Sequence, residues 1–216
     1  MRILFVIPAR AGSKRLPGKN KKILGGKPLI CHTLEFALDV FSPNDTICLT
    51  SDDKEILEIG KSYEGVLLVD RPKELASDSA SSLDVMIHAM NFAGVKKNHI
   101  DTIVLLQPTT PFRIKSDFDS MKSRFQYYKM NLHSSITTVK GNHKNKVYFD
   151  PINHKFASNP GSKHGYLNGS IYFIKKKYLL NNDKLNFEDS YFHLMSERNS
   201  VDIDTLSDWN LAEQLI

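Results

Sequence analysis

The sequence has little of several features that mark particular classes of protein. Only two cysteines occur, without a CxxC pair, which is too few for a disulfide framework. The eight histidines are scattered, with no HExxH and no Cys/His cluster, so a zinc site is not expected. No run approaches the roughly 18 apolar residues of a membrane span. The N-terminal apolar run stops at Pro8 without a cleavage site. We therefore expect a cytoplasmic protein that has no membrane partner.

Acidic residues are absent from the first 34 positions, where eight of the 29 lysines and arginines lie. The remaining 21 basic residues face 24 acidic ones, so the net charge of +5 becomes −3 beyond residue 34. A nucleic-acid binder presents its charge along an extended phosphate backbone. A local excess fits a small polyanionic ligand better, and we expect no nucleic-acid partner.

Strand-like and helix-like segments alternate along the 216 residues, which is a suitable length for one domain with its own core. Apolar runs predict strands, and apolar residues at helical spacing predict helices. The alternation predicts an α/β fold with an open, mostly parallel sheet. Strands are predicted at 2–7, 45–53, 65–72, 101–107, 134–139, 146–150, 168–174 and 201–204, and helices at 28–40, 53–63, 81–94, about 115–128 and the C-terminus.

The loop "IPARAGSKRLPGKN" at 7–20 follows the first predicted strand, beyond whose carboxyl end a ligand of such a sheet lies. It is not a P-loop, because five residues separate Gly12 from Gly18 and Asn20 stands where Ser or Thr is needed. Glycine lets backbone N–H groups approach a phosphate, and the cations neutralise it. We predict a phosphate-binding loop; a solvated basic loop is the alternative.

Two further polar clusters follow predicted strands. "RPKELASDSASSLD" places Arg71 after a strand and several serines before a helix N-terminus, where free N–H groups attract anions. A plain capping segment is the alternative there. "LQPTTPFR" ends a buried strand at Gln107, and the prolines that follow could hold this amide toward a site. A proline-rich turn is the alternative there.

A fourth cluster, "VDIDTLSDW", contains two carboxylates two residues apart. On a strand, Asp202 and Asp204 would project from the same face. They would repel each other unless a cation lay between them, and hard oxygen ligands suit Mg²⁺. The alternative is a capping box formed by Thr205 and Asp208, which leaves Asp202 unexplained.

Together these stretches, with "NGSIYF" at 168–173, resemble the acylneuraminate cytidylyltransferases, the CMP-sialic acid synthetase family. The resemblance covers nearly the whole chain in family order. It implies a Rossmann-like three-layer α/β sandwich, with a dimerisation element inserted at about 130–166 in a single domain, 1–216. It also implies a homodimer that joins CTP to a nonulosonic acid with Mg²⁺, giving the CMP-sugar and pyrophosphate.

The resemblance implies roles for particular residues as well. Gln107 would orient the sugar near the α-phosphate, and one of the two aspartates would help to deprotonate the attacking hydroxyl. The implied catalytic residues are Arg10, Lys19, Gln107, Asp202 and Asp204; the nucleotide-binding residues are Arg10, Ser13, Lys14, Lys19, Asn20, Arg71 and Ser82; the sugar-binding residues are Gln107, Lys163, Asn168 and Tyr172; and the metal ligands are Asp202 and Asp204.

The sequence departs from the family pattern near the sugar site. Tyr166 and Leu167 stand where Arg-Pro often precedes "NG", and the preceding loop offers only Lys155, Lys163 and His164 as cations. Lysine pairs with a carboxylate less directionally than arginine does. The acid therefore stays open among N-acetylneuraminic, legionaminic and other nonulosonic acids. A CMP-Kdo-type synthetase and a non-catalytic CTP-binding regulatory protein remain the alternative functions.

Overall fold

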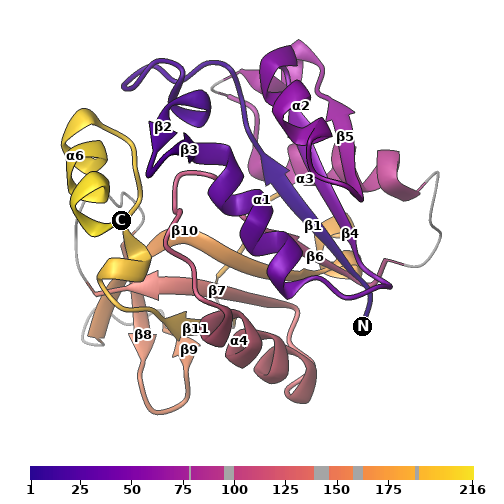
Figure 1. Cartoon of the computed structure of the whole chain (residues 1–216). Coiled ribbons are helices and arrows are strands. Elements are labelled where there is room, and N and C mark those ends of the chain that lie inside the picture. Colours follow the sequence, from indigo (N-terminus) through magenta and orange to yellow (C-terminus); the bar gives the residue numbers. More distant parts are fainter. Residues whose placement is uncertain (78, 95–99, 139–145, 158–162, 188–189) are drawn as a thin grey trace.

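The computed structural model describes residues 1–77, 79–94, 100–138, 146–157, 163–187 and 190–216. In these ranges a nine-stranded sheet forms the centre of the molecule, with helices on both of its faces (Figure 1). In their order across the sheet, the strands are β5 (Val66–Asp70), β4 (Thr46–Ser51), β1 (Ile3–Pro8), β6 (Thr102–Leu105), β10 (Lys163–Lys175), β7 (Leu132–Thr137), β11 (Tyr191–Leu194), β9 (Lys155–Phe156) and β8 (Lys146–Asp150).

The half of the sheet that contains the N-terminal strands is parallel. β1 pairs in parallel with β4 and with β6, and β4 pairs in parallel with β5. β10 is antiparallel to β6, β7 and β8, whereas β11 is parallel to β7 and antiparallel to β9. The predicted α/β class is confirmed, but the predicted mostly parallel sheet is not. The sheet is mixed, because β10 runs antiparallel to its neighbours and β9 is antiparallel to β11 and β8.

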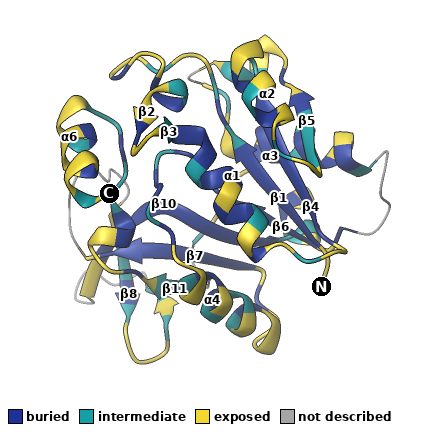
Figure 2. Ribbon diagram, viewed as in Figure 1, coloured by how far each residue is buried: buried dark blue, intermediate teal, exposed yellow. Residues whose placement is uncertain are grey.

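Alternation along β1 places its side chains in two separate cores. Ile3, Phe5 and Ile7 pack with helices α1 (Leu29–Val40), α2 (Lys54–Lys61) and α4 (Lys115–Tyr127). Leu4 and Val6 pack on the other face with α3 (Ser82–Gly94) and α5 (Lys176–Leu180). The strands are accordingly buried through most of the sheet, as Figure 2 shows. Burial on both faces explains why these strands are continuous apolar runs in the sequence.

A third, smaller core joins the two ends of the chain. α6 (Leu206–Leu215) packs against the opening loop and against the hairpin of β2 (Ile23–Leu24) and β3 (Lys27–Pro28), and Figure 1 shows these elements side by side. The core contains Leu16, Leu24, Leu29, Ile203, Trp209 and Ala212. The C-terminal helix therefore supports the loop that follows β1.

Most predicted elements are found near their predicted bounds, with one clear exception. The predicted strand at 201–204 is wrong, because this segment is irregular and joins no ladder. The backbone N–H of Ile203 instead donates to the carbonyl of Thr109 at 2.7 Å. The sequence did not predict β9, β11 or α5, which have two, four and five residues and are too short to show a clear period.

Three short 3-10 helices complete the described structure: η1 (Lys19–Lys21), η2 (Lys73–Ala76) and η3 (Arg198–Ser200). Within the range 130–166, β7, β8 and β9 continue the central sheet, whereas 139–145 and 158–162 lie outside the described residues. The dimerisation role of this range stays a prediction. No helix in the described part of the chain is long and apolar enough to cross a membrane.

Candidate active site

A cleft of about 570 Å³ lies where the loops after β1, β5 and β6 meet. Because the three strands are parallel neighbours or near neighbours, their carboxyl ends share one edge of the sheet, where ligands of such folds bind. Residues from both ends of the chain line the cleft: Pro8, Arg10, Ser13, Lys14, Arg15, Leu16, Lys19, Asn20, Arg71, Leu75, Ser77, Ala80, Ser82, Val85, Gln107, Pro108, Thr109 and Asp204.

The opening loop is anchored to the fold at several points. The N–H of Ala11 donates to Asp52 Oδ1 at 2.9 Å, and Asn20 Nδ2 donates to the carbonyl of Arg10 at 3.1 Å. Gly18 has a φ of 65°, which a glycine adopts without a steric penalty, and precedes η1. Lys19 and Asn20 are only 7% and 6% exposed. The loop therefore forms a fixed wall of the cleft and does not extend freely into solvent, as a solvated basic loop would.

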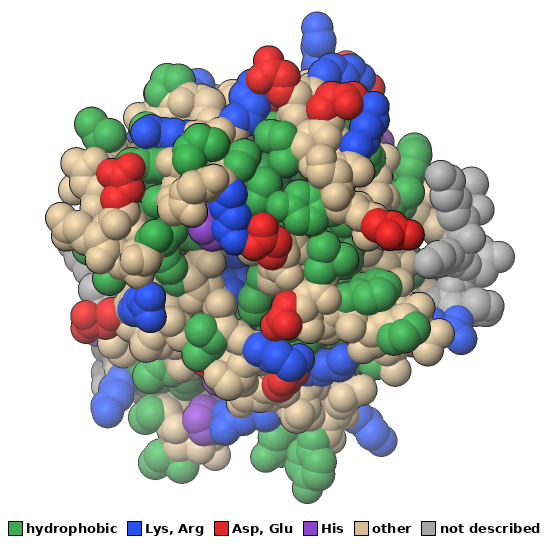
Figure 3. All heavy atoms as spheres, in the orientation of Figure 1, with side chains coloured by type: hydrophobic (Ala, Val, Ile, Leu, Met, Phe, Trp, Pro, Cys, Tyr) green, Lys and Arg blue, Asp and Glu red, His purple; other side chains and the backbone are tan. Residues whose placement is uncertain are grey.

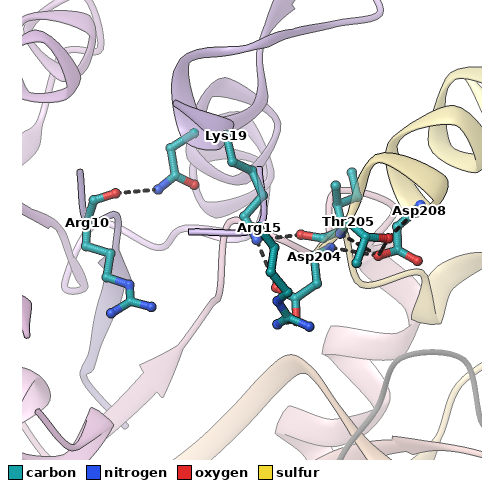
Figure 4. Close-up of polar contacts among 8 residues, drawn as sticks. Arg10, Arg15, Lys19, Asp204, Thr205 and Asp208 are labelled. Carbon is teal, nitrogen blue, oxygen red and sulfur yellow. Dashed lines mark hydrogen bonds and ion pairs between the residues drawn. The ribbon is translucent and has the colours of Figure 1, made fainter. Parts of the chain in front are cut away.

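Lys19 and Arg15 converge on Asp204, as Figure 4 shows. Lys19 Nζ donates to Asp204 Oδ1 at 2.9 Å and to the carbonyl of Ile203 at 2.6 Å, and Arg15 donates to Asp204 Oδ2. Burial raises the pKa of Asp204, but the hydrogen bond and charge of Lys19, with those of Arg15, outweigh burial and leave this pKa below its ordinary value. Asp204 is thus a carboxylate held ionised at the edge of the cationic loop.

Asp202, two residues before Asp204, has a different environment. It is not among the residues that line the cleft, and its Oδ1 is buried without a hydrogen-bond partner. Burial raises the pKa of Asp202 to about 6. The hydrogen bond from Thr109 lowers this pKa, and the negative charge of Asp204 raises it further. The two aspartates therefore differ in proton affinity. The capping box of Thr205 and Asp208, raised as an alternative, is confirmed at the start of α6 and leaves Asp202 outside it.

The donor atoms at the predicted metal site come from Asp202 and Asp204. No group of three or more His, Cys, Asp or Glu side chains that could hold a metal occurs in the described residues. Asp202 and Asp204 alone would offer hard oxygen donors, one of them the unpartnered Oδ1 of Asp202. Mg²⁺ commonly takes one or two carboxylates and completes its shell with water and substrate phosphates. The unpartnered Oδ1 of Asp202 fits Mg²⁺ in that form, whereas both oxygens of Asp204 already accept from Lys19 and Arg15.

Arg71 and Asn20 also line the cleft and are buried polar residues with unsatisfied atoms. Arg71 is 6% exposed, and its Nε and Nη2 have no hydrogen-bond partner. The Nη2 atom lies 3.8 Å from Asp52 Oδ1, and burial lowers the pKa of Arg71 from its ordinary value. Asn20 Oδ1 is likewise buried without a partner. Unpaired buried donors and acceptors are costly, so the cleft is suited to a polar ligand that completes them.

The serines before α3 divide into two roles. The Ser81 hydroxyl accepts from the N–H of Asp84 at 3.1 Å and donates to its carboxylate, which is helix capping. Ser82, the first residue of α3, lies on the cleft together with Ser77. The prediction of a capping segment thus holds for Ser81, and the structure places Ser82 where a ligand contact is possible.

Three of the four predicted sugar-binding residues lie away from the cleft. Asn168 is fully buried, where its Oδ1 accepts from Ser135 Oγ at 2.6 Å and its Nδ2 donates to Ser200 Oγ at 3.0 Å. Tyr172 is buried on the same strand, and Lys163 is exposed where β10 begins, beside β8. β10 is an interior strand covered on both faces, so the geometry of this chain gives support only to Gln107.

The cations proposed from the loop before β10 also lie elsewhere. Lys155 lines a second cavity of about 410 Å³ that adjoins α4 and β11, and His164 is paired with β8 through the backbone. The cations on the cleft itself are Arg10, Lys14, Arg15, Lys19 and Arg71.

The structure identifies contributors that the sequence reasoning missed. Arg15 pairs with Asp204, Thr109 hydrogen-bonds Asp202, and Arg113 is buried with its guanidinium bonded to the loop that carries Gln107. One feature of the sequence could have indicated Arg113: it is the one charged residue of the segment "LQPTTPFR" and stands at its end.

Residues 4–215 match the cytidylyltransferase family. The chain belongs to this family. The chain is 33% identical over 231 residues to the CMP-N,N'-diacetyllegionaminic acid synthase of Legionella pneumophila, covering 100% of this chain and 97% of that protein. It is 31% identical to the pseudaminic acid cytidylyltransferase of Campylobacter jejuni, covering 100% and 96%. It is 30% identical to the N-acylneuraminate cytidylyltransferase of Escherichia coli, covering 98% of this chain and 51% of that protein.

Solved structures with a similar fold include two nucleotidyltransferases. One is a CMP:2-keto-3-deoxy-manno-octonic acid synthetase complexed with CTP, with a TM-score of 0.74, 16% identity and coverage of 100% of this chain and 98% of that one. The other is a glucose-1-phosphate thymidylyltransferase, described as putative, from Bacillus anthracis, with a TM-score of 0.71, 16% identity and coverage of 99% and 94%. At 16% identity, the similarity to these two structures shows the fold alone.

Proposed function

We propose that this chain activates a nonulosonic acid with CTP, releasing pyrophosphate and forming the CMP-sugar. The family and the three relatives named above, which are described as acting on legionaminic, pseudaminic and N-acylneuraminic acids, support the proposal. The observation that carries it is the cleft itself. Buried unsatisfied groups of Arg71 and Asn20 line it together with the cationic side chains of the opening loop, Lys19 among them.

Different lining residues of the cleft suit different parts of CTP. The guanidinium of Arg71 offers donors to the acceptor edge of cytosine, and Asn20 Oδ1 offers an acceptor to its amino group. Arg10, Lys14 and Lys19, with Ser13, would neutralise and hold the triphosphate. On the face seen in Figure 3, basic and acidic side chains are interspersed, which suits a small ligand better than a nucleic-acid backbone.

In the reaction, the anomeric hydroxyl oxygen of the acid forms a bond to the α-phosphorus, and the bond from that phosphorus to pyrophosphate breaks. The residues mainly position the reactants and neutralise charge, because phosphoryl transfer needs little covalent work from the protein. The hydroxyl proton needs an acceptor, and one of the two aspartates, Asp202 or Asp204, would help to take it. Gln107, on the wall of the cleft, would orient the sugar.

We also propose that Mg²⁺ is held by Asp202 and Asp204 with the phosphates of CTP. When bound, it would neutralise phosphate charge during the reaction. Asp204→Ala is expected to lower kcat by tenfold or more at saturating Mg²⁺, whereas Asp119→Ala, at an exposed site on α4, should leave kcat unchanged. Equal turnover of wild type and Asp204→Ala would remove Asp204 from the metal site.

We also propose that the protein is a cytoplasmic homodimer with a Rossmann-like fold, and that residues 130–166 form the dimerisation element. Cross-linking together with sedimentation would test the dimer. A mass corresponding to one chain at all concentrations would contradict it.

The deciding experiment is a substrate panel. Pyrophosphate release is measured with CTP, Mg²⁺ and separately diacetyllegionaminic, pseudaminic, N-acetylneuraminic and 2-keto-3-deoxy-manno-octonic acids. Turnover with one of the first three supports the proposal, and turnover with the last alone favours the CMP-Kdo-type alternative. CTP binding without turnover of any acid would favour a regulatory protein and overturn the proposed activity.

A further inference from the structure

Arg113 joins three parts of the fold and uses every N–H group of its guanidinium. Nε donates to the carbonyl of Ser170 at 2.8 Å, in β10. Nη1 donates to the carbonyl of Thr110 at 2.6 Å and to Thr33 Oγ1 at 3.1 Å, in α1. Nη2 donates to the carbonyl of Gln107 at 2.5 Å and to Thr110 Oγ1 at 2.7 Å. One side chain therefore ties the loop after β6 to β10 and α1.

This arrangement is specific to arginine. Arg113 is 7% exposed, and no described carboxylate forms an ion pair with it. Burial lowers the pKa of Arg113 to about 9, and the Asp202 charge opposes that effect. Five donors in a rigid plane match five oxygen acceptors, whereas a lysine has three donors around one atom. A neutral side chain would avoid the cost of burying the charge, so the hydrogen-bonding geometry explains the residue better than packing does.

Gly169, beside Ser170, contacts the side chain of Gln107. Gly169 has a φ of 72°, and a Cβ atom placed there would lie 2.6 Å from Gln107 Oε1 and 3.3 Å from its Cδ. The register of β10 against β7 shifts between Leu167 and Tyr172, so Gly169 lies where the regular pairing of the two strands is interrupted. The absent side chain leaves the space that the Gln107 amide occupies.

The amide of Gln107 forms no hydrogen bond within the described part of the chain, although it lies on the cleft. The backbone carbonyl of Gln107 accepts from Arg113 and also from the N–H and the hydroxyl of Thr110. Arg113 holds the backbone of Gln107, and Gly169 borders its side chain.

We propose that Gly169 and Arg113 are positioning residues that aim the amide of Gln107 into the cleft and so orient the acid for attack. This inference rests on the proposed function, because the sugar contact of Gln107 belongs to it. Neither residue touches the substrate. Both act through Gln107, and their effects should disappear when Gln107 is removed.

A double-mutant cycle tests this dependence. Gly169→Ala and Gln107→Ala should each lower kcat/KM for the accepted acid by about tenfold, with the KM for CTP within twofold of wild type. The double variant should lose no more than Gln107→Ala alone, since the two changes disable one interaction. Multiplicative losses in the double variant would overturn the inference.

Gly65→Ala is the matched control, because Gly65 has a φ of 81° and has nothing within 4 Å of an added Cβ. It lies between α2 and β5, away from the cleft, and measures the cost of left-handed backbone alone. Its kcat/KM should equal that of wild type. A loss equal to that of Gly169→Ala would mean that backbone strain explains the effect, which would overturn the inference.

A second readout does not require activity. The side-chain ¹⁵N–¹H₂ resonances of Gln107, assigned by their loss in Gln107→Ala, should shift in Gly169→Ala and in Arg113→Lys but not in Gly65→Ala. Unchanged resonances in both test variants would overturn the inference even if the enzyme is active. Shifted resonances in a protein that turns over no acid would support the positioning contacts while the proposed function fails.

Discussion

Lys19 holds two oxygens of the 203–204 segment from inside the opening loop, and it is almost fully buried. Lys19→Met keeps the aliphatic stem but removes the charge that we expect to meet the triphosphate. Charge-assisted hydrogen bonds contribute about 1.5–3 kcal/mol, which corresponds to a loss of roughly 10- to 100-fold in affinity. Calorimetric titration with CTP measures this loss.

Lys61→Met is the matched control for that experiment, since Lys61 is an exposed lysine at the end of α2. Its affinity for CTP should equal that of wild type. If both variants lost affinity equally, the effect would reflect overall charge, and the placement of Lys19 at the phosphates would be wrong.

Asp202 has a pKa of about 6, above its ordinary value of 3.8. The folded state therefore binds this proton more tightly than the unfolded state. The stability that the proton contributes is complete below pH 3.8 and is lost as the pH rises through 6. Asp202→Asn removes this dependence. Relative to wild type, its free energy of unfolding should improve by about 1–2 kcal/mol between pH 4.5 and 7.5.

Urea unfolding of both proteins across that range, in a buffer with a metal chelator, gives the two pH profiles. Only the change in the free energy of unfolding with pH is compared between the two proteins, so a destabilisation by the substitution that is the same at every pH cancels. Parallel profiles for wild type and Asp202→Asn would show that Asp202 does not titrate in this window.

At the scale of elements, the start of α6 determines where the 202–204 segment lies. Thr205 accepts from the N–H of Asp208, and the carboxylate of Asp208 accepts from the N–H groups of Asp204 and Thr205. Thr205→Ala removes the first bond and should lower the free energy of unfolding by about 1 kcal/mol. Urea unfolding measures this change.

Ser207→Ala provides the comparison within the same helix turn, because Ser207 is exposed and caps nothing in the described structure. Its stability should stay within about 0.5 kcal/mol of wild type. Equal destabilisation by both variants would argue that the helix end tolerates no change, and the capping contribution would not be demonstrated.

Across the whole molecule, the cleft is assembled from segments nearly the full length of the chain apart. The opening loop meets Asp204, and α6 packs on the same loop through Trp209 and Leu16. Lys22 Nζ also lies 4.3 Å from the centroid of the Trp209 ring. A ligand that binds the loop should therefore stabilise both ends of the chain together.

CTP with Mg²⁺ at 100 times its Kd should raise the free energy of unfolding by about 2.7 kcal/mol. Hydrogen exchange should show protection at 10–22 and at 203–209, which share one core, and at the loop after β5, which lines the same cleft. Protection restricted to residues 71–77 would contradict a triphosphate site on the opening loop.

Much of the fold was predictable because the central strands are buried on both faces and therefore read as apolar runs. The 201–204 segment shows why this reasoning has a limit. Its alternating Val, Asp, Ile, Asp pattern has the period of a strand, yet its backbone bonds to Thr109 in a loop and joins no sheet. A strand needs a neighbouring edge, and only the tertiary arrangement supplies one.

The sequence by itself determined the α/β class, the approximate bounds of the longer helices and the polar segments that line the cleft, because apolar spacing and capping involve residues close together in the chain. It also determined that the excess of positive charge is local. Only the tertiary structure decided which of those polar groups face a ligand. It placed Asn168 and Tyr172 in the interior and gave Asp202 and Asp204 opposite pKa shifts. Desolvation and contacts between distant segments produce these differences, and neither is encoded in local sequence spacing.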